Sequence, residues 1–433
     1  MTVLSVKENL TSQENQKHQF PVNYAYDYLN GGIGYLSLPP LTLNKLLQNK
    51  EFLQMAGQRD HSGKYTQRSD NAIDIFPLTA GLPWATGILS CRQNKHWNVS
   101  IETTRIFLQH LAADKSTQDL YKSGHSVAEI SQKELDSTLE EGWVKFPTYL
   151  FPEGDKERTK LLAAVNVFIF VFDDFWEMHD ITSVSELDKA CILIPKYKLT
   201  NSVSKFTKVQ DEFIARMQPR LNNITSPKTK LQVLIDQAIE EIYGVDRASG
   251  NTAGQEMLEL MVRFFSRPPP PTQYKDMEDF LLYRHEDAAV PYVLGCTKFS
   301  LNSSVDLDSP RLARYLRLVK DHVSVANDLG SWEKEKKAFD TGKVLYMINA
   351  VDVVKDLFKL PSYSAAVAMT QAFQLQIEVE INAEIERLID QDDLNNEEWR
   401  FIDATLHVMS GNVFVSTVMS RYGGEKFKLS GTQ

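Results

Sequence analysis

The segment NDLGSWEKE, residues 327–335, places oxygen-bearing side chains at every fourth position of a stretch that otherwise has the pattern of a helix. On an α-helix, residues four apart are displaced by about 40° around the axis and about 6 Å along it. Asn327, Ser331 and Glu335 would therefore form one stripe of an amide, a hydroxyl and a carboxylate. Such oxygen ligands suit a hard cation, and Mg²⁺ usually keeps water or substrate phosphate in its remaining positions. Taken alone, the stripe could also be a solvated polar face.

A second acidic group follows the most apolar stretch of the chain. In VFIFVFDDFWE, Asp173 and Glu177 are four residues apart and Asp174 and Glu177 are three apart, which places them close together on a helix. Carboxylates packed at the end of a buried segment repel one another and lose hydration unless cations compensate. The pattern indicates a second metal site, or a helix that simply emerges into water at Asp173.

Two further segments could supply cationic donors. YRHEDAA places Arg284 three residues before Asp287, on a predicted helix that follows a proline-rich break. An arginine presents a rigid fork of donors that suits a metal-bound phosphate, although an Arg–Asp pair at this spacing could also be an ordinary surface pair. The dipeptide Arg421–Tyr422, near the C-terminus, is too common to indicate anything by itself.

The four segments together, in this order and with long gaps between them, resemble the class I terpene synthases. The likeness is to the fungal sesquiterpene synthases in particular, of the aristolochene, trichodiene and longiborneol synthase kind. DDFWE is similar to the aspartate-rich motif of that family, and NDLGSWEKE is similar to its second metal motif. The resemblance extends from roughly residue 95 to the end of the chain.

The resemblance implies a role for each matching residue. The implied metal ligands are Asp173, Asp174, Glu177, Asn327, Ser331 and Glu335. The implied catalytic residues are Asp173, Arg284, Asp287, Asn327 and Glu335. Contacts to the substrate and its diphosphate are expected from Arg284, Lys334, Arg421, Tyr422 and Phe170. The family binds three Mg²⁺ ions when diphosphate is present, and we expect the same cofactor here.

The expected reaction is metal-triggered ionisation of farnesyl diphosphate, followed by cyclisation to a sesquiterpene hydrocarbon or alcohol and release of diphosphate. The protein would then be a carbon–oxygen lyase acting on phosphates, in fungal secondary metabolism. An allylic carbocation would be quenched by water, so the site must be dry and apolar. Phe170, one turn before Asp173, is the candidate aromatic wall, although simple core packing explains it equally well.

Other functions remain open. Geranylgeranyl diphosphate is the alternative substrate, which would make the protein a diterpene synthase, and a non-catalytic relative that binds prenyl lipids is the alternative from another class. A chain-elongating prenyltransferase would need a second aspartate-rich motif, and a class II cyclase would need D-x-D-D. The sequence contains no second aspartate-rich motif, and its one match to D-x-D-D is DQDD at residues 390–393.

The elements that position these groups are predicted to be helices. Asp155 is expected to cap a helix through Leu161–Met178, and another helix should begin near Asp276 and be disturbed at Pro291. Ser309 is the predicted N-cap of the helix that carries the oxygen stripe, and a final helix should run to Tyr422. Alternating strand patterns are few. We therefore expect an all-α fold, which the resemblance specifies as the class I terpenoid synthase helical bundle around a central apolar active-site cavity.

The remaining expectations concern domains and partners. We predict a disordered tail over residues 1–20, an N-terminal extension packing on the core over 21–95, and the catalytic domain over 96–433. The net charge of −10 disfavours binding to nucleic acid, and the longest apolar run is too short for a membrane span. The N-terminus lacks the pattern of a secretory signal. A cytoplasmic monomer or homodimer with a prenyl diphosphate substrate is expected.

Overall fold

The structure is a computed structural model, and it describes residues 71–77, 82–118, 121–122, 125–177, 230–265, 267–268, 270–344 and 346–422. The predicted tail over residues 1–20 and most of the predicted extension over 21–95 lie outside these residues. The helices, strands and contacts of the structure are those of the described residues.

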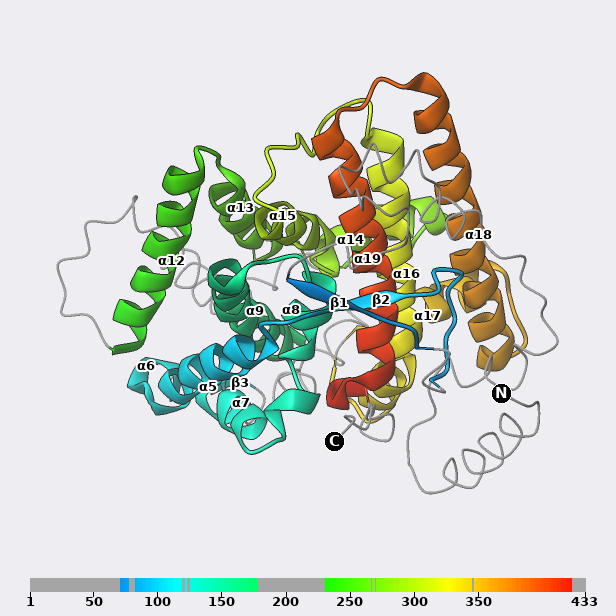
Figure 1. Ribbon diagram of the computed structural model, residues 1–433. Coiled ribbons are helices and arrows are strands. Elements are labelled where there is room, and N and C mark those ends of the chain that lie inside the picture. The colour runs from blue at the N-terminus through cyan, green and yellow to red at the C-terminus, as the bar shows by residue number, and fades with distance from the viewer. Residues whose placement is uncertain are drawn as a thin grey trace, which may run out of the picture.

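Helices dominate the described residues, which confirms the prediction of an all-α fold (Figure 1). The first half holds α5 (Trp97–Ala113), α6 (Lys115–Gln118), α7 (Val127–Leu135), α8 (Lys145–Leu150), α9 (Lys156–Glu177), α12 (Lys230–Ser249) and α13 (Ala253–Phe265). The second half holds α14 (Met277–Asp287), α15 (Val290–Ser300), α16 (Ala313–Asp340), α17 (Ala350–Leu357), α18 (Tyr363–Gln391) and α19 (Asn396–Val418). Two 3-10 turns are η1 (Leu139–Glu141) and η2 (Ser420–Tyr422).

The described strands are short and form two antiparallel pairs. One pair joins β1 (Ala72–Ile75) to β2 (Cys91–Asn94), and the other joins β3 (Tyr121–Lys122) to β4 (His125–Ser126). Neither pair is part of a larger sheet, so the core is built by helices.

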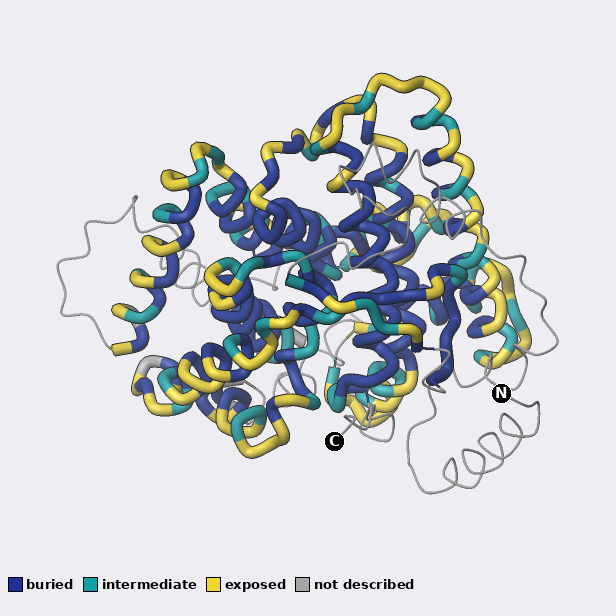
Figure 2. The backbone as a smooth tube through the Cα atoms, in the orientation of Figure 1, coloured by how far each residue is buried: buried dark blue, intermediate teal, exposed yellow. Residues whose placement is uncertain are grey.

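The long helix α16 lies in the middle of the bundle and contacts α14, α15, α17, α18 and α19 (Figure 1). A row of apolar residues at helical spacing, which begins at the N-cap of α16, is fully buried; it consists of Leu312, Leu316, Val319, Val323 and Ala326. Helix α9 is buried all round from Leu161 to Phe172, consistent with its continuous apolar sequence (Figure 2). The two predicted metal motifs therefore lie on helices that are anchored in the core.

Local signals placed some helix ends correctly. The Asp155 carboxylate accepts a hydrogen bond from the Arg158 backbone N–H at 2.8 Å, as expected of an N-cap. Asp276 caps α14 in the same way, accepting from the Asp279 N–H at 2.9 Å. The predicted disturbance near Pro291 is also confirmed, because α14 ends at Asp287 and α15 starts at Val290.

Two predicted helix ends were wrong. Ser309 does not cap α16, since its carbonyl accepts the Leu312 N–H in a preceding turn and the helix begins at Ala313. The final helix stops at Val418 rather than at Tyr422. Arg421 and Tyr422 lie in the 3-10 turn that follows, so their side chains do not continue the α-helical spacing that the sequence suggested.

The segment before α5 is tied to the helical bundle by buried polar contacts. Arg92, whose side chain is 2% exposed, pairs with Asp74, with Glu153 and with Asp403 of α19. The Gly87 N–H donates to Glu378 of α18 at 2.7 Å. The described residues before position 96 thus share contacts with α18 and α19, while the domain boundary at residue 96 stays a prediction.

No helix among these described residues combines the length and the apolarity needed to cross a bilayer.

Replacing Arg92 by Met tests the importance of this tie. Removing one partner of a buried ion pair leaves the remaining carboxylates uncompensated, so Arg92→Met should lower the free energy of unfolding by about 3–5 kcal/mol in urea denaturation. The control is Arg247→Met, because Arg247 pairs with Glu240 at the surface and both side chains are more than half exposed. It should change the free energy by less than about 1 kcal/mol. Equal effects in the two variants would contradict a structural role for Arg92.

Candidate functional site

The acidic end of α9 meets the C-terminal turn. Arg421 donates through Nη2 to Asp173 at 3.2 Å, and its Nη1 bonds to Asp174. Both aspartate side chains are about one quarter exposed, whereas Arg421 is 9% exposed. Residues 247 positions apart in the chain are therefore in direct contact, as the combined motifs implied. Helix α9 also includes Glu177, whose side chain lies outside the described set, so its predicted metal role stays a prediction.

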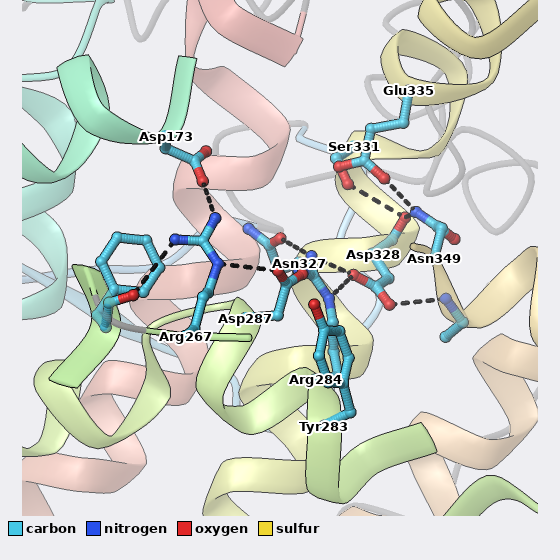
Figure 3. A network of polar contacts seen from close by, with 12 residues as sticks. Asp173, Arg267, Tyr283, Arg284, Asp287, Asn327, Asp328, Ser331, Glu335 and Asn349 are labelled. Carbon is cyan, nitrogen blue, oxygen red and sulfur yellow. Dashed lines mark hydrogen bonds and ion pairs between the residues drawn. The ribbon is translucent and has the colours of Figure 1, made fainter. Parts of the chain in front are cut away.

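The oxygen stripe lies on α16 as predicted (Figure 3). The Asn327 amide accepts from Arg284 at 3.2 Å and donates toward the Tyr422 hydroxyl at 3.4 Å. Ser331 is buried, and the Glu335 carboxylate accepts from the Asn349 amide at 2.8 Å. Asn327 and Glu335 are only partly buried, so the stripe is reachable from solvent at both ends. Lys334, between them in sequence, is half-buried.

Arg284 is the centre of a buried ionic cluster. Its Nη1 donates to Asp287 at 2.5 Å, and its Nε donates to Asp328 at 2.8 Å. The Arg284 side chain is 8% exposed and Asp328 is completely buried. The alternative of an ordinary surface pair for Arg284 and Asp287 is therefore wrong.

Asp328 was missed by the sequence analysis. One of its carboxylate oxygens accepts from Arg284, and the other accepts the Ala350 backbone N–H at 2.7 Å. Asn349 donates to the Asp328 carbonyl at 2.8 Å, so the start of α17 is held against α16. The available signal was a carboxylate between Ala326 and Leu329, a position on α16 where apolar neighbours predict burial and burial demands a cationic partner.

Arg267 was also missed, because RPPPPTQ was interpreted only as a helix break. Its side chain is 2% exposed, and it donates to Asp287 at 3.1 Å and to Asp173 at 3.4 Å (Figure 3). Its guanidinium carbon lies 4.2 Å from the centre of the Phe264 ring. Nothing in the local pattern distinguishes this arginine from a surface residue, so only the packed structure reveals it.

Burial and opposite charges set the protonation of the cluster. The pKa of the Asp328 carboxyl is raised to about 7, mainly by burial; the Arg284 guanidinium opposes the rise and the charge of Glu335 adds to it. Burial lowers the pKa of Arg284, but the neighbouring carboxylates outweigh burial and hold it well above its usual range. Arg284 therefore stays charged, and Asp328 depends on it for compensation.

Phe170 belongs to an aromatic cluster next to these groups. Its ring stacks on Trp143 with centroids 5.3 Å apart and meets Phe146 edge-on at 5.3 Å. The Arg421 guanidinium carbon lies 5.8 Å from the Phe170 ring centre. Phe170 thus packs in the core and adjoins the acidic end of α9, while its role as an aromatic wall for the substrate stays a prediction.

The donor set fits a hard divalent cation in its chemistry. It consists of carboxylate, amide and hydroxyl oxygens on two anchored helices, with partly exposed aspartates at the end of α9. In this conformation arginines hold the aspartates, and no three His, Cys, Asp or Glu side chains gather as a preformed metal site within the described ranges. A cation that binds Asp173 would therefore compete with the arginine donors that contact this carboxylate.

Comparison with known proteins agrees with this geometry. Residues 271–373 match the terpene synthase family 2, C-terminal metal-binding region. The chain is 24% identical over 362 residues to terpene cyclase 6 of Gibberella fujikuroi, which covers 82% of this chain and 86% of that protein. Over 154 residues it is 27% identical to a bifunctional sesterterpene synthase of Aspergillus aculeatus, covering 35% of this chain and 21% of that protein.

The fold matches that of aristolochene synthase from Penicillium roqueforti. The TM-score is 0.55 at 16% identity, and the match covers 75% of this chain and 95% of that one. The chain is therefore similar to the terpene synthases in its metal-binding region, in its curated relatives and in its fold. It resembles the fungal sesquiterpene synthases, as its motifs predicted, and the prediction of a carbon–oxygen lyase acting on prenyl diphosphates is confirmed. The match to the terpene synthase metal-binding region implies that the protein uses a divalent metal.

The position of the stripe also depends on how closely α16 approaches α19. Gly330 precedes Ser331, and a Cβ atom at Gly330 would lie 2.4 Å from the Ser416 Cβ on α19. Such a contact is impossible without a shift of one helix. The lack of a side chain at Gly330 therefore allows α16 to pack close to α19 and determines how deeply Ser331 is buried.

Replacing Gly330 by Ala should force α16 away from α19 and lower the free energy of unfolding by about 1–3 kcal/mol. The matched control is Gly244→Ala within α12, where a Cβ would meet no atom closer than the Arg247 guanidinium at 3.8 Å. That change should raise stability by up to about 1 kcal/mol, because alanine favours a helix. Thermal and urea unfolding of both variants measures the difference; a stabilised Gly330→Ala variant would refute the close approach.

Proposed function

We propose that this protein is a Mg²⁺-dependent sesquiterpene cyclase that ionises farnesyl diphosphate and cyclises the resulting carbocation. The observation that carries the proposal is the convergence of Asp173, Arg284, Asn327, Arg421 and Tyr422, which come from separate segments, into one polar network. When bound, Mg²⁺ supplies Lewis-acid stabilisation of the charge that develops on departing diphosphate. Three ions are the number expected from the family resemblance.

The arginines supply fixed positive charge for the diphosphate. Arg284 is charged, almost completely buried and held by Asp287 and Asp328, so its fork is oriented before substrate arrives. Arg421 and Tyr422 adjoin the acidic end of α9 and the stripe, respectively. We assign all three, with Lys334, to diphosphate binding.

The metal-ligand assignments follow the two motifs. We assign Asp173, Asp174 and Glu177 to the first motif, and Asn327, Ser331 and Glu335 to the second. Asn349 holds Glu335 in place by its hydrogen bond, and the same amide holds the Asp328 carbonyl. Because its carboxylate is already oriented, Glu335 loses little freedom when it binds a cation.

The hydrocarbon end of the substrate requires an apolar, water-free wall. The cluster of Phe170, Trp143 and Phe146 lies beside Arg421 and is the aromatic surface assigned to it. Ring faces also stabilise a cation, which suits the intermediate after ionisation. The proposal of a C15 substrate rests on resemblance to the sesquiterpene synthases. A longer substrate is the alternative, since one relative is named as a sesterterpene synthase.

The first test is product formation by the purified full-length protein. It is incubated with Mg²⁺ and, separately, with geranyl, farnesyl or geranylgeranyl diphosphate, and extracts are read by gas chromatography–mass spectrometry. A cyclic C15 product is the expected result. A C20 product would support the same mechanism with geranylgeranyl diphosphate as the substrate. Longer linear diphosphates in the aqueous phase would indicate chain elongation instead of cyclisation.

Removal of a stripe residue tests the metal assignment. Asn327→Ala and Glu335→Ala should each lower turnover to below about one per cent of wild type, because a lost metal ligand removes stabilisation of the departing group. Circular dichroism should show an unchanged helical content. Glu333→Ala is the control, since Glu333 is exposed on the same helix two residues earlier. Wild-type turnover in either stripe variant would contradict the assignment of that residue as a metal ligand.

A non-catalytic prenyl-lipid-binding relative is the second candidate, and ligand-dependent unfolding separates the two. Ligands that bind the native state raise its melting temperature. The proposed enzyme should melt at a higher temperature with Mg²⁺ and inorganic diphosphate together than with either alone. No shift, together with no product, would favour the binding protein.

A further inference from the structure

Arg267 follows α13 and joins groups that the proposed function keeps in separate roles. Its Nε donates to Asp287 on α14, and its Nη2 donates to Asp173 on α9. Its Nη1 is directed at the Phe264 carbonyl at 3.5 Å. The side chain is 2% exposed, so these three hydrogen bonds are made away from bulk solvent.

The contacts form a continuous chain between the two metal motifs (Figure 3). Asp173 bonds to Arg267, Arg267 to Asp287, Asp287 to Arg284, and Arg284 to Asn327. The two oxygens of Asp287 are divided between the arginines, Oδ1 accepting from Arg267 and Oδ2 from Arg284. Loss of one arginine therefore changes the charge balance felt by the other.

We propose that Arg267 is a positioning residue that couples cation binding at Asp173 to anion binding at Arg284. This inference rests on the proposed function. It assigns to Arg267 no contact with the reacting atoms; the residue acts through Asp173 and Asp287.

The coupling follows from an exchange of partners. A divalent cation and the Arg267 guanidinium compete for Asp173, so the arginine weakens the binding of the metal alone. Once the cation holds Asp173, the Arg267 guanidinium no longer shares its charge with that carboxylate and interacts more strongly with Asp287, to which its Nε already donates. Asp287 then compensates the charge of Arg284 less, so Arg284 binds a diphosphate more tightly, and each ligand favours the other.

The position of the guanidinium explains why it would not simply swing away. Its carbon atom lies 4.2 Å from the Phe264 ring centre and 5.6 Å from the Phe172 ring centre. Contacts of a guanidinium with ring faces are attractive, and the Nε bond to Asp287 fixes a further point. Arg267 can therefore release Asp173 and still keep its charge beside Asp287.

The test compares Arg267→Gln with wild type by isothermal titration calorimetry. Mg²⁺ is titrated into the full chain with and without inorganic diphosphate, and a titration without protein removes the heat of the complex between the two ligands. Diphosphate should tighten Mg²⁺ binding in wild type. In Arg267→Gln this enhancement should fall by about tenfold. The affinity for Mg²⁺ alone should not weaken, since a competitor for Asp173 has been removed.

Arg263→Gln is the matched control. Arg263 lies on α13, four residues before Arg267, and pairs with Glu286 on α14. It is therefore a neighbouring arginine that joins α13 to α14 outside the site. This variant should keep the wild-type enhancement. Arg267→Lys keeps the charge but not the fork, and it should retain the melting temperature while losing most of the enhancement.

The outcomes separate this inference from the proposed function. Wild type without any enhancement would overturn both. Wild type with enhancement, together with an undiminished enhancement in Arg267→Gln or in Arg267→Lys, would overturn the inference alone. Weaker Mg²⁺ binding by the same factor with and without diphosphate would also overturn it, because that result describes a merely structural residue.

Discussion

The structure depends on compensating buried arginines in a helical interior. A guanidinium removed from water is costly unless carboxylates surround it with good geometry. Arg284 meets this requirement with Asp287 on its own helix and Asp328 on α16, and Arg267 meets it with Asp287 and Asp173. The positions of α9, α14 and α16 are therefore linked by charge as well as by apolar packing.

Such a cluster is a poor way to gain stability, since well-packed apolar residues of similar volume often serve as well or better. Its retention here is better explained by chemistry. The same arrangement stores cationic donors and oxygen ligands side by side, each neutralising the other until ligands arrive. The apolar surroundings make this possible: α9 is buried up to Phe172, and the stripe follows a fully apolar face of α16. A rigid bundle holds the groups, while the groups themselves keep exchangeable partners.

The sequence predicted those parts of the site that short spacings determine. Helical periodicity alone put Asn327, Ser331 and Glu335 on one face. The three-residue spacing of Arg284 and Asp287 allowed a pair between them but suggested one at the surface, whereas the observed pair is buried. The sequence did not predict Arg267 or Asp328, because their roles arise from packing between helices distant in sequence. The helix ends at Ala313 and Val418 were not predicted for a related reason. Ser309 has the local sequence of an N-cap but lies in a turn before α16, and the apparent helical periodicity near Arg421 extends beyond the last residue of α19.

That last difference has a consequence for the site. If Arg421 and Tyr422 continued α19, the helical pitch would fix the directions of their side chains about 100° apart. In the 3-10 turn they instead reach different partners, Arg421 the acidic end of α9 and Tyr422 the amide of Asn327. The turn thus links the two metal motifs, as Arg267 does, but it follows the second motif in the chain whereas Arg267 precedes it. Two arginines, one from each link, share the two oxygens of Asp173. Asp173, the first ligand of the predicted metal centre, is therefore the residue at which a bound cation would compete with both Arg267 and Arg421.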